Sequence, residues 1–386
     1  MASSTLIKLA ILNNHITPYR VPVYKGLGER FLTYLLISGR ELNRDTWQGL
    51  EHSLENVDVR KVWGFTLQFF ERRKGNVFDP RYLHINPGYI WELLKIRPDI
   101  VISAEMGFRS LVALTYGLIF RKPVWILWGG TIHTERHRSF FKQTMRQTIF
   151  RKVKRWISYG ETTTEYLLAL GVSRSYILQI QNCIDERQFN ADDIQAKLTL
   201  SPSPTLLYTG QLIKRKGVDL FLHAASSLQQ KGHIFSILIV GNGLEKENLI
   251  KLADHLELSN ITFLPGQSPS DMPAIYKSAD ILVFPTLEEV WGLVVNESLW
   301  SGLAVACSMY AGCASEIIPK INTFDPLRPK SFENALEKAL KNELLPADTS
   351  CLLTVEQVIS KIANCISADN TPESFSTGLI EHTMHQ

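Results

Sequence analysis

The chain has 386 residues, of which 45% are hydrophobic, and its formal net charge is +3. This length exceeds one ordinary domain and supports two cores of about 150 to 200 residues each, so we expect two domains. The five cysteines are odd in number and form no Cys-x-x-Cys pair, which argues against a disulfide framework and a zinc site; we expect reduced cytoplasmic thiols.

Charge divides unevenly along the chain. Residues 1–190 contain 27 Lys and Arg against 16 Asp and Glu, a balance of +11, so the remainder stands at −8 and the sum is +3. A basic first half suggests a partner that is anionic, such as a membrane surface or an acidic acceptor. An ordinary surface bias with no partner is the alternative.

The amino terminus, "MASSTLIKLAIL", lacks the basic leader and unbroken apolar stretch of a signal peptide, because Lys8 interrupts it. The apolar run at 110–120 is bounded by Arg109 and Arg121 and falls far short of the roughly 20 residues that a membrane span needs. We expect a cytoplasmic protein, either soluble or peripheral on the inner face of a membrane.

Short apolar, β-branched runs alternate with longer amphipathic stretches, which is typical of strands and helices around a parallel sheet. In the first half, strands are predicted within 7–12, 32–38, 99–105, 123–129 and 155–161. In the second half, they are predicted within 205–210, 235–243, 261–266, 280–286 and 303–308. Each set makes a doubly wound sheet.

The domain boundaries follow from composition. Polar residues, Ser and Pro accumulate over 184–203, so the linker is expected there. We predict a first domain at 1–185, a second at 186–350, and a C-terminal helix and polar tail at 351–386 that packs back on the first. Two such domains leave a cleft between the carboxyl ends of their strands, where open α/β sheets bind ligands. The turn after the first strand, "NNHITPYR", has no glycine, so no dinucleotide fingerprint or Walker loop is present there.

A basic turn follows the first strand of the second half. In "YTGQLIKRKGVDL" the strand ends at Gly210 and a helix starts near Gly217 or Val218, so Lys214 to Lys216 crowd the helix amino terminus. The helix dipole disfavours cations at that end unless an anion is bound, which favours a phosphate site. A solvated turn is the alternative. The glycines Gly241 and Gly243 in "LIVGNG" fit either a close approach of a ligand to the backbone or a plain tight turn.

The stretch "EEVWGLVVNE" carries carboxylates at both ends of an apolar run. Gly292 marks a turn, and the following segment reads as a helix closed by Gly302. Glu289 lies at the amino end of this helix, where capping is an alternative to a functional role. Glu297 lies on a mainly apolar helix face and needs hydrogen-bond donors, which a sugar or ribose would supply and a backbone or arginine partner could replace.

These motifs together resemble the retaining glycosyltransferases of family 4, the glycosyl transferases group 1, which have the GT-B fold. Glu289, "VWGLVVN" and Glu297 resemble the paired-glutamate signature of the family, and "GQLIKRKG", "ILIVGNG", "ADILVFPT" and "SGLAVACS" resemble its flanking segments. First-half segments such as "HINPG", "RPDIVIS" and "GETTTEYLLALGV" are similar to a branch that assembles polysaccharides and glycoconjugates. The resemblance covers roughly residues 6 to 330. It implies two Rossmann-like doubly wound domains facing each other across a cleft.

The resemblance also implies roles for individual residues. Lys216 would steady the leaving diphosphate, Glu289 would lie near the donor sugar, and Glu297 would bind the ribose hydroxyls. Arg215, next to Lys216, is our candidate to replace a family arginine that this chain lacks at Gln211. The amides at the helix start would meet the diphosphate, namely those of Gly292, Leu293 and Val294. Four residues of the preceding loops would complete the donor site: Gly210, Gln211, Gly241 and Gly243.

The family pattern is not followed everywhere. Gln211 stands where the family often has arginine, and the family histidine of the first domain has only His133 as a weak counterpart, because Trp128 occupies its usual place. The expected partners are a nucleotide sugar and a glycan or lipid-linked acceptor, with peripheral contact to an anionic membrane surface and no nucleic acid. No metal or other cofactor is expected.

Three other functions stay open. A sugar-nucleotide epimerase of similar fold and a non-catalytic nucleotide-sugar-binding protein are the main alternatives. A glycoside hydrolase that uses Glu289 and Glu297 as its carboxylate pair is less favoured, because the cations near Lys216 would then serve no anion.

Overall fold

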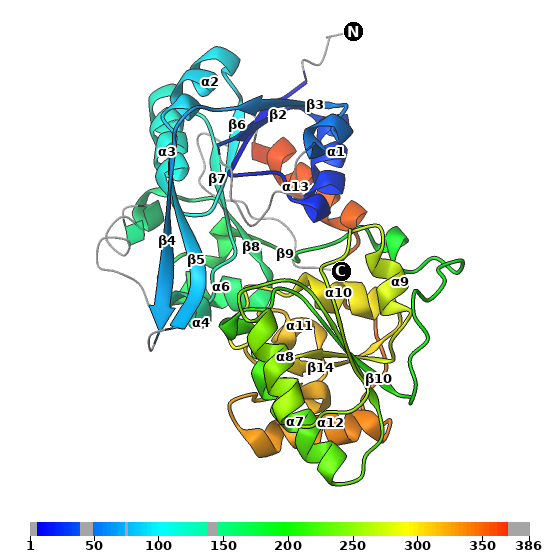
Figure 1. Cartoon of the computed structure of the whole chain (residues 1–386). Helices are drawn as coiled ribbons and strands as arrows, with labels where there is room; N and C mark the ends of the chain where they lie inside the picture. The colour runs from blue at the N-terminus through cyan, green and yellow to red at the C-terminus, as the bar shows by residue number, and fades with distance from the viewer. Residues whose placement is uncertain (1–5, 39–48, 74–75, 137–145, 148, 370–386) are drawn as a thin grey trace. The chain divides into compact units, whose positions relative to one another are not determined.

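The computed structural model describes residues 6–38, 49–73, 76–136, 146–147 and 149–369 (Figure 1). The chain divides into two compact units. The first comprises Met1–Phe69, Arg81–Asn182 and Leu353–Gln386, and the second comprises Phe70–Pro80 and Cys183–Leu352. The end of the expected polar tail, residues 370–386, lies outside the described residues.

The first unit is built on a parallel sheet with the strand order β3-β2-β1-β6-β7-β8-β9. Its helices include α1, which precedes β2, and α3, which connects β6 to β7. The strands are β1 (Lys8–Asn13), β2 (Leu32–Ile37), β3 (Val57–Lys61), β6 (Ile100–Ala104), β7 (Val124–Trp128), β8 (Trp156–Tyr159) and β9 (Ile177–Ile180). The helices are α1 (Val21–Arg30), α2 (Gly88–Ile96), α3 (Phe108–Phe120), α4 (Ile132–Glu135), α6 (Gly160–Ala169) and α13 (Val355–Asp369).

The second unit contains a parallel sheet with the order β12-β11-β10-β13-β14-β15. Its strands are β10 (Thr205–Thr209), β11 (Ser236–Val240), β12 (Ile261–Leu264), β13 (Ile281–Phe284), β14 (Ala304–Ser308) and β15 (Thr323–Phe324). Its helices are α7 (Val218–Gln230), α8 (Lys246–His255), α9 (Met272–Tyr276), α10 (Leu293–Trp300), α11 (Ala314–Ile317) and α12 (Pro329–Leu340).

Both sheets are doubly wound, because the strand order reverses at an inner strand. β1 pairs with β2 on one side and β6 on the other, and β10 pairs with β11 and β13. Such reversals open a crevice outside the carboxyl ends of the two diverging strands, where α/β proteins bind ligands. The topology therefore gives each unit one candidate location, beyond β1 and β6 in the first and beyond β10 and β13 in the second.

All ten predicted strands are present, and the predicted Rossmann-like fold is confirmed. The central strands, such as β6, β10 and β11, are wholly buried, as expected of parallel strands covered on both faces, whereas β12 at the edge of its sheet is half-buried. The sequence did not predict β3, β9 or β15, which are short edge strands or carry charged residues. It also missed a hairpin of β4 (Phe65–Arg73) and β5 (Asn76–Ile85), which forms a separate two-stranded sheet.

Each unit has its own apolar core. In the second unit, α7 and α12 lie side by side through stacked aromatic rings: Phe332 has its ring centroid 4.2 Å from that of Phe324 and 6.3 Å from that of Phe221. In the first unit, the core includes Trp156, which is fully buried, and Trp128 at the end of β7. These rigid cores fix the strand ends from which the functional loops emerge.

The last helix, α13, packs on α1 within the first unit. Asp369 at its end is 2% exposed and accepts a hydrogen bond of 2.9 Å from the Trp125 indole. The same carboxylate pairs with Arg155 Nε at 2.5 Å. The chain thus returns from the second unit to complete the first.

Candidate active site

The basic turn lies between β10 and α7. Lys214–Lys216 form one 3-10 turn, and Gly217 takes the left-handed conformation, with φ 64°, before α7 begins at Val218. A Cβ at position 217 would lie 2.4 Å from the carbonyl oxygen of Pro285, so only glycine allows the turn to contact the end of β13. This contact brings the basic turn to the β10/β13 reversal point.

The cations of this turn face carboxylates rather than open solvent. Lys214 Nζ lies 3.1 Å from Glu245 and 3.7 Å from Asp219. The Lys216 ammonium, 9% exposed as a residue, forms an ion pair with Glu289. The interpretation of a solvated turn is therefore wrong for Lys216, which is buried and paired.

Arg215 joins the same cluster. Its Nη1 donates to the carbonyl oxygen of Glu288 at 3.0 Å and lies 3.8 Å from Glu289 Oε2. Its own carbonyl accepts a 2.8 Å hydrogen bond from the amide of Leu287. One side-chain bond from Arg215 and one backbone bond to its carbonyl thus join the turn at 215 to the loop at 287–289.

Glu289 is held from several sides. Its carbonyl accepts from the amide of Gly312 at 3.1 Å, and its Oε1 accepts from the amide of Val290 at 3.1 Å. Burial by itself raises the pKa of this carboxyl, but Lys216 and Arg215 outweigh burial, so the pKa lies below its usual value and the group is ionised. No side chain caps α10, so capping by Glu289 is wrong: the carboxylate points to Lys216 instead.

Glu297 lies on α10, half-buried, and accepts a hydrogen bond of 2.5 Å from the Tyr276 hydroxyl on α9. Burial raises the pKa of Glu297 to about 7, although the hydrogen bond from Tyr276 lowers it. The donor that its apolar helix face required is thus a tyrosine, a partner that the sequence did not predict. A carboxylate with this pKa is partly protonated near neutral pH.

α10 begins directly after a glycine with a positive φ, which other residues rarely adopt. Gly292 has φ 105°, and a Cβ there would lie 2.7 Å from the Phe284 ring. It is followed directly by Leu293 and Val294, which are half-buried. The first amides of a helix have no acceptor within the helix and carry partial positive charge, so this end of α10 favours an anion.

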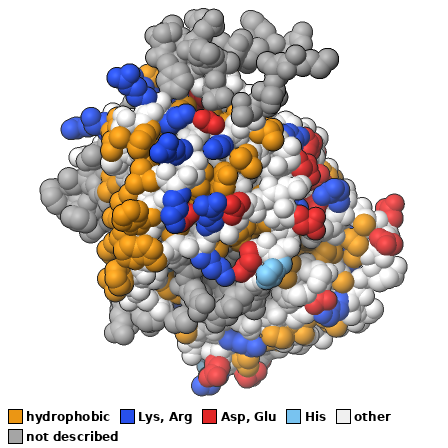
Figure 2. Space-filling model, turned by 90° about the horizontal axis from the view of Figure 1, so that it is seen from above, with side chains coloured by type: hydrophobic (Ala, Val, Ile, Leu, Met, Phe, Trp, Pro, Cys, Tyr) orange, Lys and Arg blue, Asp and Glu red, His pale blue; other side chains and the backbone are white. Residues whose placement is uncertain are grey.

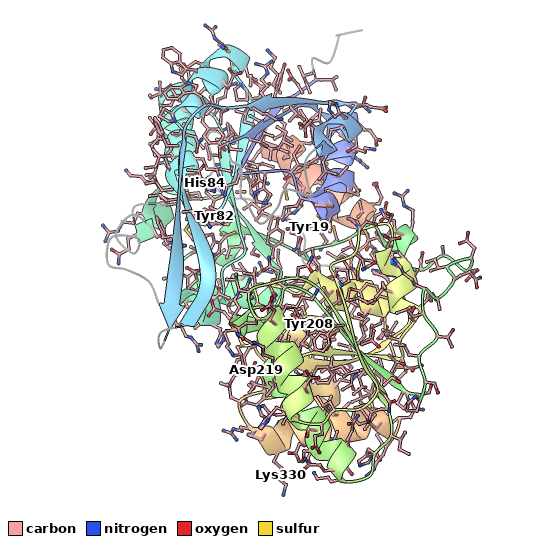
Figure 3. All side chains as sticks on the ribbon, in the orientation of Figure 1. Tyr19, Tyr82, His84, Tyr208, Asp219 and Lys330 are labelled. Atoms are coloured by element: carbon pink, nitrogen blue, oxygen red, sulfur yellow. The ribbon has the colours of Figure 1, made fainter. Side chains whose placement is uncertain are left out.

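The remaining predicted donor residues lie at the ends of β10 and β11. Tyr208, labelled in Figure 3, donates from its hydroxyl to the carbonyl of Gln211 at 2.8 Å. A Cβ on Gly241 would lie 1.9 Å from the Gly210 oxygen, and one on Gly243 would lie 2.2 Å from the Leu212 oxygen. Both glycines of "GNG" are therefore required for close packing of two loops.

His133 lies in the first unit, on α4, where its Nδ1 is 3.2 Å from Arg136 Nη1. It therefore belongs to a different unit from Lys216. Trp128, in the position where the family places its histidine, has the Arg146 guanidinium over its ring at 4.7 Å from the centroid.

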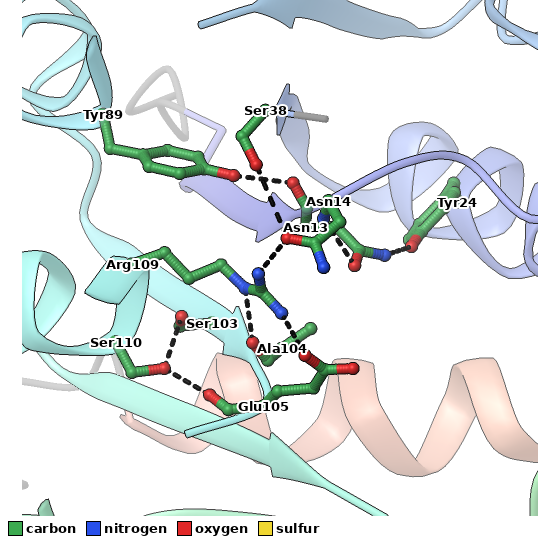
Figure 4. A network of polar contacts seen from close by, with 10 residues as sticks. All are labelled: Asn13, Asn14, Tyr24, Ser38, Tyr89, Ser103, Ala104, Glu105, Arg109 and Ser110. Atoms are coloured by element: carbon green, nitrogen blue, oxygen red, sulfur yellow. Dashed lines mark hydrogen bonds and ion pairs between the residues drawn. The ribbon is translucent and has the colours of Figure 1, made fainter. Parts of the chain in front are cut away.

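A polar network occupies the reversal point of the first unit (Figure 4). Arg109, 6% exposed, donates to the carbonyl of Ala104 at 2.5 Å, to the side chain of Asn14, and to Glu105 at 2.8 Å. Asn14 follows β1 and Glu105 follows β6, so one guanidinium joins the carboxyl ends of the two diverging strands. Glu105 has φ 62°, and its side chain is 66% exposed.

Sequence reasoning missed this network. It noted that the turn "NNH" contains no glycine but did not weigh its two polar residues directly after a buried strand. Asn13 and Asn14 at that place, together with Glu105 after the strand that ends at Ala104, were the available signal. The side chain of Asn13 donates to the Tyr24 hydroxyl at 2.9 Å, and its carbonyl accepts from Tyr89 at 2.6 Å.

Among the described residues there is no group of three or more His, Cys, Asp or Glu side chains that could hold a metal ion. Two doubly wound Rossmann-like units are the elements of the GT-B fold. The comparison with solved structures shows this fold.

Residues 190–350 match the family model "Glycosyl transferases group 1". The family model thus matches most of the second unit. The D-inositol 3-phosphate glycosyltransferase of Nocardia farcinica is 33% identical over 132 residues, which are 32% of this chain and 29% of that protein. The sulfoquinovosyl transferase of Arabidopsis thaliana is 23% identical over 311 residues, which are 77% of this chain and 58% of that protein. The chain thus matches less than two thirds of the length of these relatives.

Two solved structures illustrate the shared fold. The structure of Anabaena HepE in complex with UDP and glucose has a TM-score of 0.67 at 16% identity and covers 93% of this chain and 95% of its own. The lipopolysaccharide outer core galactosyltransferase WaaB has a TM-score of 0.68 at 14% identity, over 94% of this chain and 100% of its own.

Proposed function

We propose that the chain is a retaining, metal-independent glycosyltransferase that moves a hexosyl or related sugar from a nucleotide diphosphate donor to an acceptor. The observation that carries this proposal is the cluster of buried Lys216 with the half-buried Arg215 and Glu289 beside the reversal point of the second sheet. Two cations are gathered there by one carboxylate, which keeps them charged and positioned in the absence of an anion. A bound diphosphate would offer both cations stronger partners.

The donor would be bound by groups with separate tasks. Lys216, Arg215 and the first amides of α10, at Gly292, Leu293 and Val294, would stabilise the charge that develops on the leaving diphosphate. Glu297 would accept hydrogen bonds from the ribose hydroxyls, in exchange for or in addition to the one from Tyr276. Because these groups supply positive charge, the reaction would need no metal. Retention of the anomeric configuration is inferred from the family resemblance alone.

The acceptor side is proposed on the first unit. The network around Arg109 fixes Glu105 at the end of β6 with its carboxylate exposed, which suits binding of hydroxyl groups. HepE binds UDP and glucose, as its structure records, and the named relatives act on inositol phosphate or transfer sulfoquinovose. For this chain we propose a glycan or a lipid-linked acceptor, met in the cytoplasm at the inner face of a membrane.

The first experiment is a thermal-shift screen of the purified chain against UDP, GDP, ADP and their common sugar derivatives, in the presence of EDTA. A nucleotide that stabilises the wild-type chain in EDTA, and stabilises Lys216→Ala and Glu297→Ala much less, supports the metal-free donor site. If no nucleotide stabilises the chain, the assigned donor residues are wrong. Product analysis with donor alone then separates transfer from epimerisation, since an epimerase converts its substrate without an acceptor.

A further inference from the structure

The hairpin of β4 and β5 exposes apolar side chains that no described helix covers. Trp63 is 57% exposed, Phe65 66%, Leu67 55% and Phe69 44%. The last three alternate along β4, so they share one face of the two-stranded sheet. An isolated hairpin is marginally stable in water, and a face of this kind normally packs on a partner.

The described residues on the opposite face of the hairpin include Thr66, Tyr82 and His84. Thr66 Oγ1 lies 2.9 Å from His84 Nδ1, and the ring of Tyr82 stacks on that of His84 with centroids 6.2 Å apart (both labelled in Figure 3). Leu83 and Ile85 alternate with these residues along β5 and are also exposed. Among the described side chains, Phe65, Leu67, Phe69, Leu83 and Ile85 therefore share one face of the hairpin, and Thr66, Tyr82 and His84 share the other.

The apolar face continues onto α2. The amide of Gly88 donates to the carbonyl of Trp63 at 3.3 Å, so the start of α2 lies against the base of the hairpin. The outward side of α2 carries Ile90, 45% exposed, and Trp91, 59% exposed. We name this combined surface the aromatic surface and define it by Trp63, Phe65, Leu67, Phe69, Ile90 and Trp91.

Exposed cations lie at the far ends of α2 and its neighbour α3. Lys95 and Arg97 end α2, and Arg121 follows α3, whose last turn exposes Leu118 and Ile119. The Tyr116 hydroxyl donates to the carbonyl of Pro98 at 3.1 Å, which holds the two helix ends together. Figure 2 shows hydrophobic side chains gathered on one face of the molecule with Lys and Arg side chains beside them.

The negative charge of the one acidic side chain on α2 is balanced by two cations. Glu92 lies 2.9 Å from Arg60 and 3.2 Å from Lys95, and hydrogen bonds from Arg60 hold its pKa below the usual value. The charge next to the aromatic surface is therefore positive. A second copy of this chain docked face to face would bring like charges together, which disfavours a symmetric dimer through this surface.

We infer that the aromatic surface docks on an anionic lipid bilayer. Trp and Phe side chains partition into the interfacial region of a bilayer, and Lys or Arg side chains beside them attract anionic headgroups. Among the described residues no helix is long and apolar enough to cross a membrane. Surface docking needs no such helix, because the exposed side chains reach only the headgroup and outer acyl region.

The position of the surface links it to the acceptor side of the first unit. The hairpin begins after β3 and ends before α2, and Tyr89 of α2 donates to the carbonyl of Asn13 at 2.6 Å, within the network of Figure 4. Docking would thus bring the reversal point of the first sheet toward the bilayer. This last step rests on the proposed function, whereas the docking itself does not.

The test is co-sedimentation of the full chain with vesicles of phosphatidylcholine, with or without about a third of phosphatidylglycerol, at low and physiological salt. We expect binding that needs the anionic lipid and weakens with salt. The double variant Trp63→Ser with Trp91→Ser should bind vesicles at least about tenfold more weakly than the wild type, because two exposed aromatic side chains are lost. Lys95→Ala with Arg97→Ala should remove most of the dependence on anionic lipid.

The matched control replaces exposed apolar side chains of the second unit, Ile234→Ser with Leu327→Ser, which are 71% and 59% exposed in the wild type. This control should bind vesicles as the wild-type chain does. Circular dichroism and the thermal midpoint check that all variants fold.

Three results overturn the inference: no vesicle binding by the wild-type chain at physiological salt, equal binding by the Trp63/Trp91 variant, or a wild-type dimer that this variant converts to a monomer. Nucleotide thermal shifts measured on the same proteins report separately on the proposed donor site. Vesicle binding without any nucleotide response would therefore reject the proposed function and keep the docking surface.

Discussion

Lys216 is the residue on which the proposed chemistry depends most directly. Its ammonium is buried beside Glu289 and lies 5.8 Å from the ring centroid of Phe284, the last residue of β13. Lys216→Ala should lower turnover by at least about a hundredfold, because a lost electrostatic contact to developing charge costs about 3 kcal/mol. Steady-state kinetics with a donor from the screen measures this. Lys214→Ala is the matched control, since Lys214 pairs with Glu245 and Asp219 instead, and it should stay within about threefold of wild type.

Glu297 gives a prediction about pH. Its pKa is raised by burial to about 7 from an ordinary value of 4.5, so the folded chain binds more protons than the unfolded chain between these pH values. Folding stability contributed by this group is therefore present below pH 4.5 and is lost as pH rises through 7. Since the side chain is half-buried, we expect Glu297→Gln to stabilise the free chain at pH 8 by about 1 to 2 kcal/mol and to have little effect at pH 4.5. Urea unfolding at the two pH values measures it.

The same carboxyl predicts how donor binding depends on pH. Ribose hydroxyls donate to the ionised form, so binding requires loss of the proton that Glu297 holds below about pH 7. The dissociation constant of the donor should be flat above that pH and rise up to tenfold per unit below it. Glu297→Gln should bind weakly with no such rise. A wild-type constant that does not change between pH 5.5 and 8 would count against the role of Glu297.

At the scale of the element, the start of α10 depends on a glycine. Gly292→Ala would place a methyl group 2.7 Å from the Phe284 ring and would hold alanine at φ 105°. The helix start must therefore shift, and donor binding should weaken about tenfold or more together with a lower thermal midpoint.

Gly302 at the other end of α10 is the matched control. It also has a positive φ, 87°, but a Cβ there meets nothing within 4 Å. Gly302→Ala should cost about 1 kcal/mol of stability through backbone strain and should leave the donor dissociation constant unchanged. Equal effects of the two variants on donor binding would show that the geometry of the helix start is not used for binding.

At the scale of the whole molecule, α13 joins the end of the chain to the first unit. Asp369 is 2% exposed and accepts from Trp125 and Arg155, so its loss leaves the buried Trp125 indole and the half-buried Arg155 guanidinium without this acceptor. Asp369→Ala should destabilise the chain by about 2 to 4 kcal/mol in urea unfolding. Glu356→Ala removes the ion pair with Arg30, where the carboxylate side chain is 66% exposed, and should cost under about 1 kcal/mol. A cost for Asp369→Ala no larger than that of Glu356→Ala would contradict the structural role of α13.

The sequence by itself determined the two parallel sheets and most of the strands in them. A parallel strand covered on both faces must be a short apolar run, and such runs are readable one at a time. The turn at Gly217 and the helix from Leu293 were also readable, because glycine and the apolar run that follows it mark them locally. The two segments that carry Lys216 and the pair Glu289 and Glu297 were identified in the same way. Their proposed roles are the subject of the kinetic and binding tests.

The partners of these residues were decided only by tertiary structure. Lys216 and Glu289 are 73 residues apart in the chain, and Glu297 is 21 residues from the tyrosine that binds it. Capping was a reasonable alternative for Glu289 because a local pattern cannot reveal a cation brought from a distant turn. The Arg109 network was missed although Asn13, Asn14 and Glu105 mark the strand ends locally, because the arginine that joins them lies elsewhere in the chain. The exposed face of the β4–β5 hairpin was missed because a local pattern does not show which apolar side chains stay uncovered. Which strand ends meet, and which apolar side chains are left uncovered, depends on the order of strands in the sheet, and strand order is a property of the folded chain.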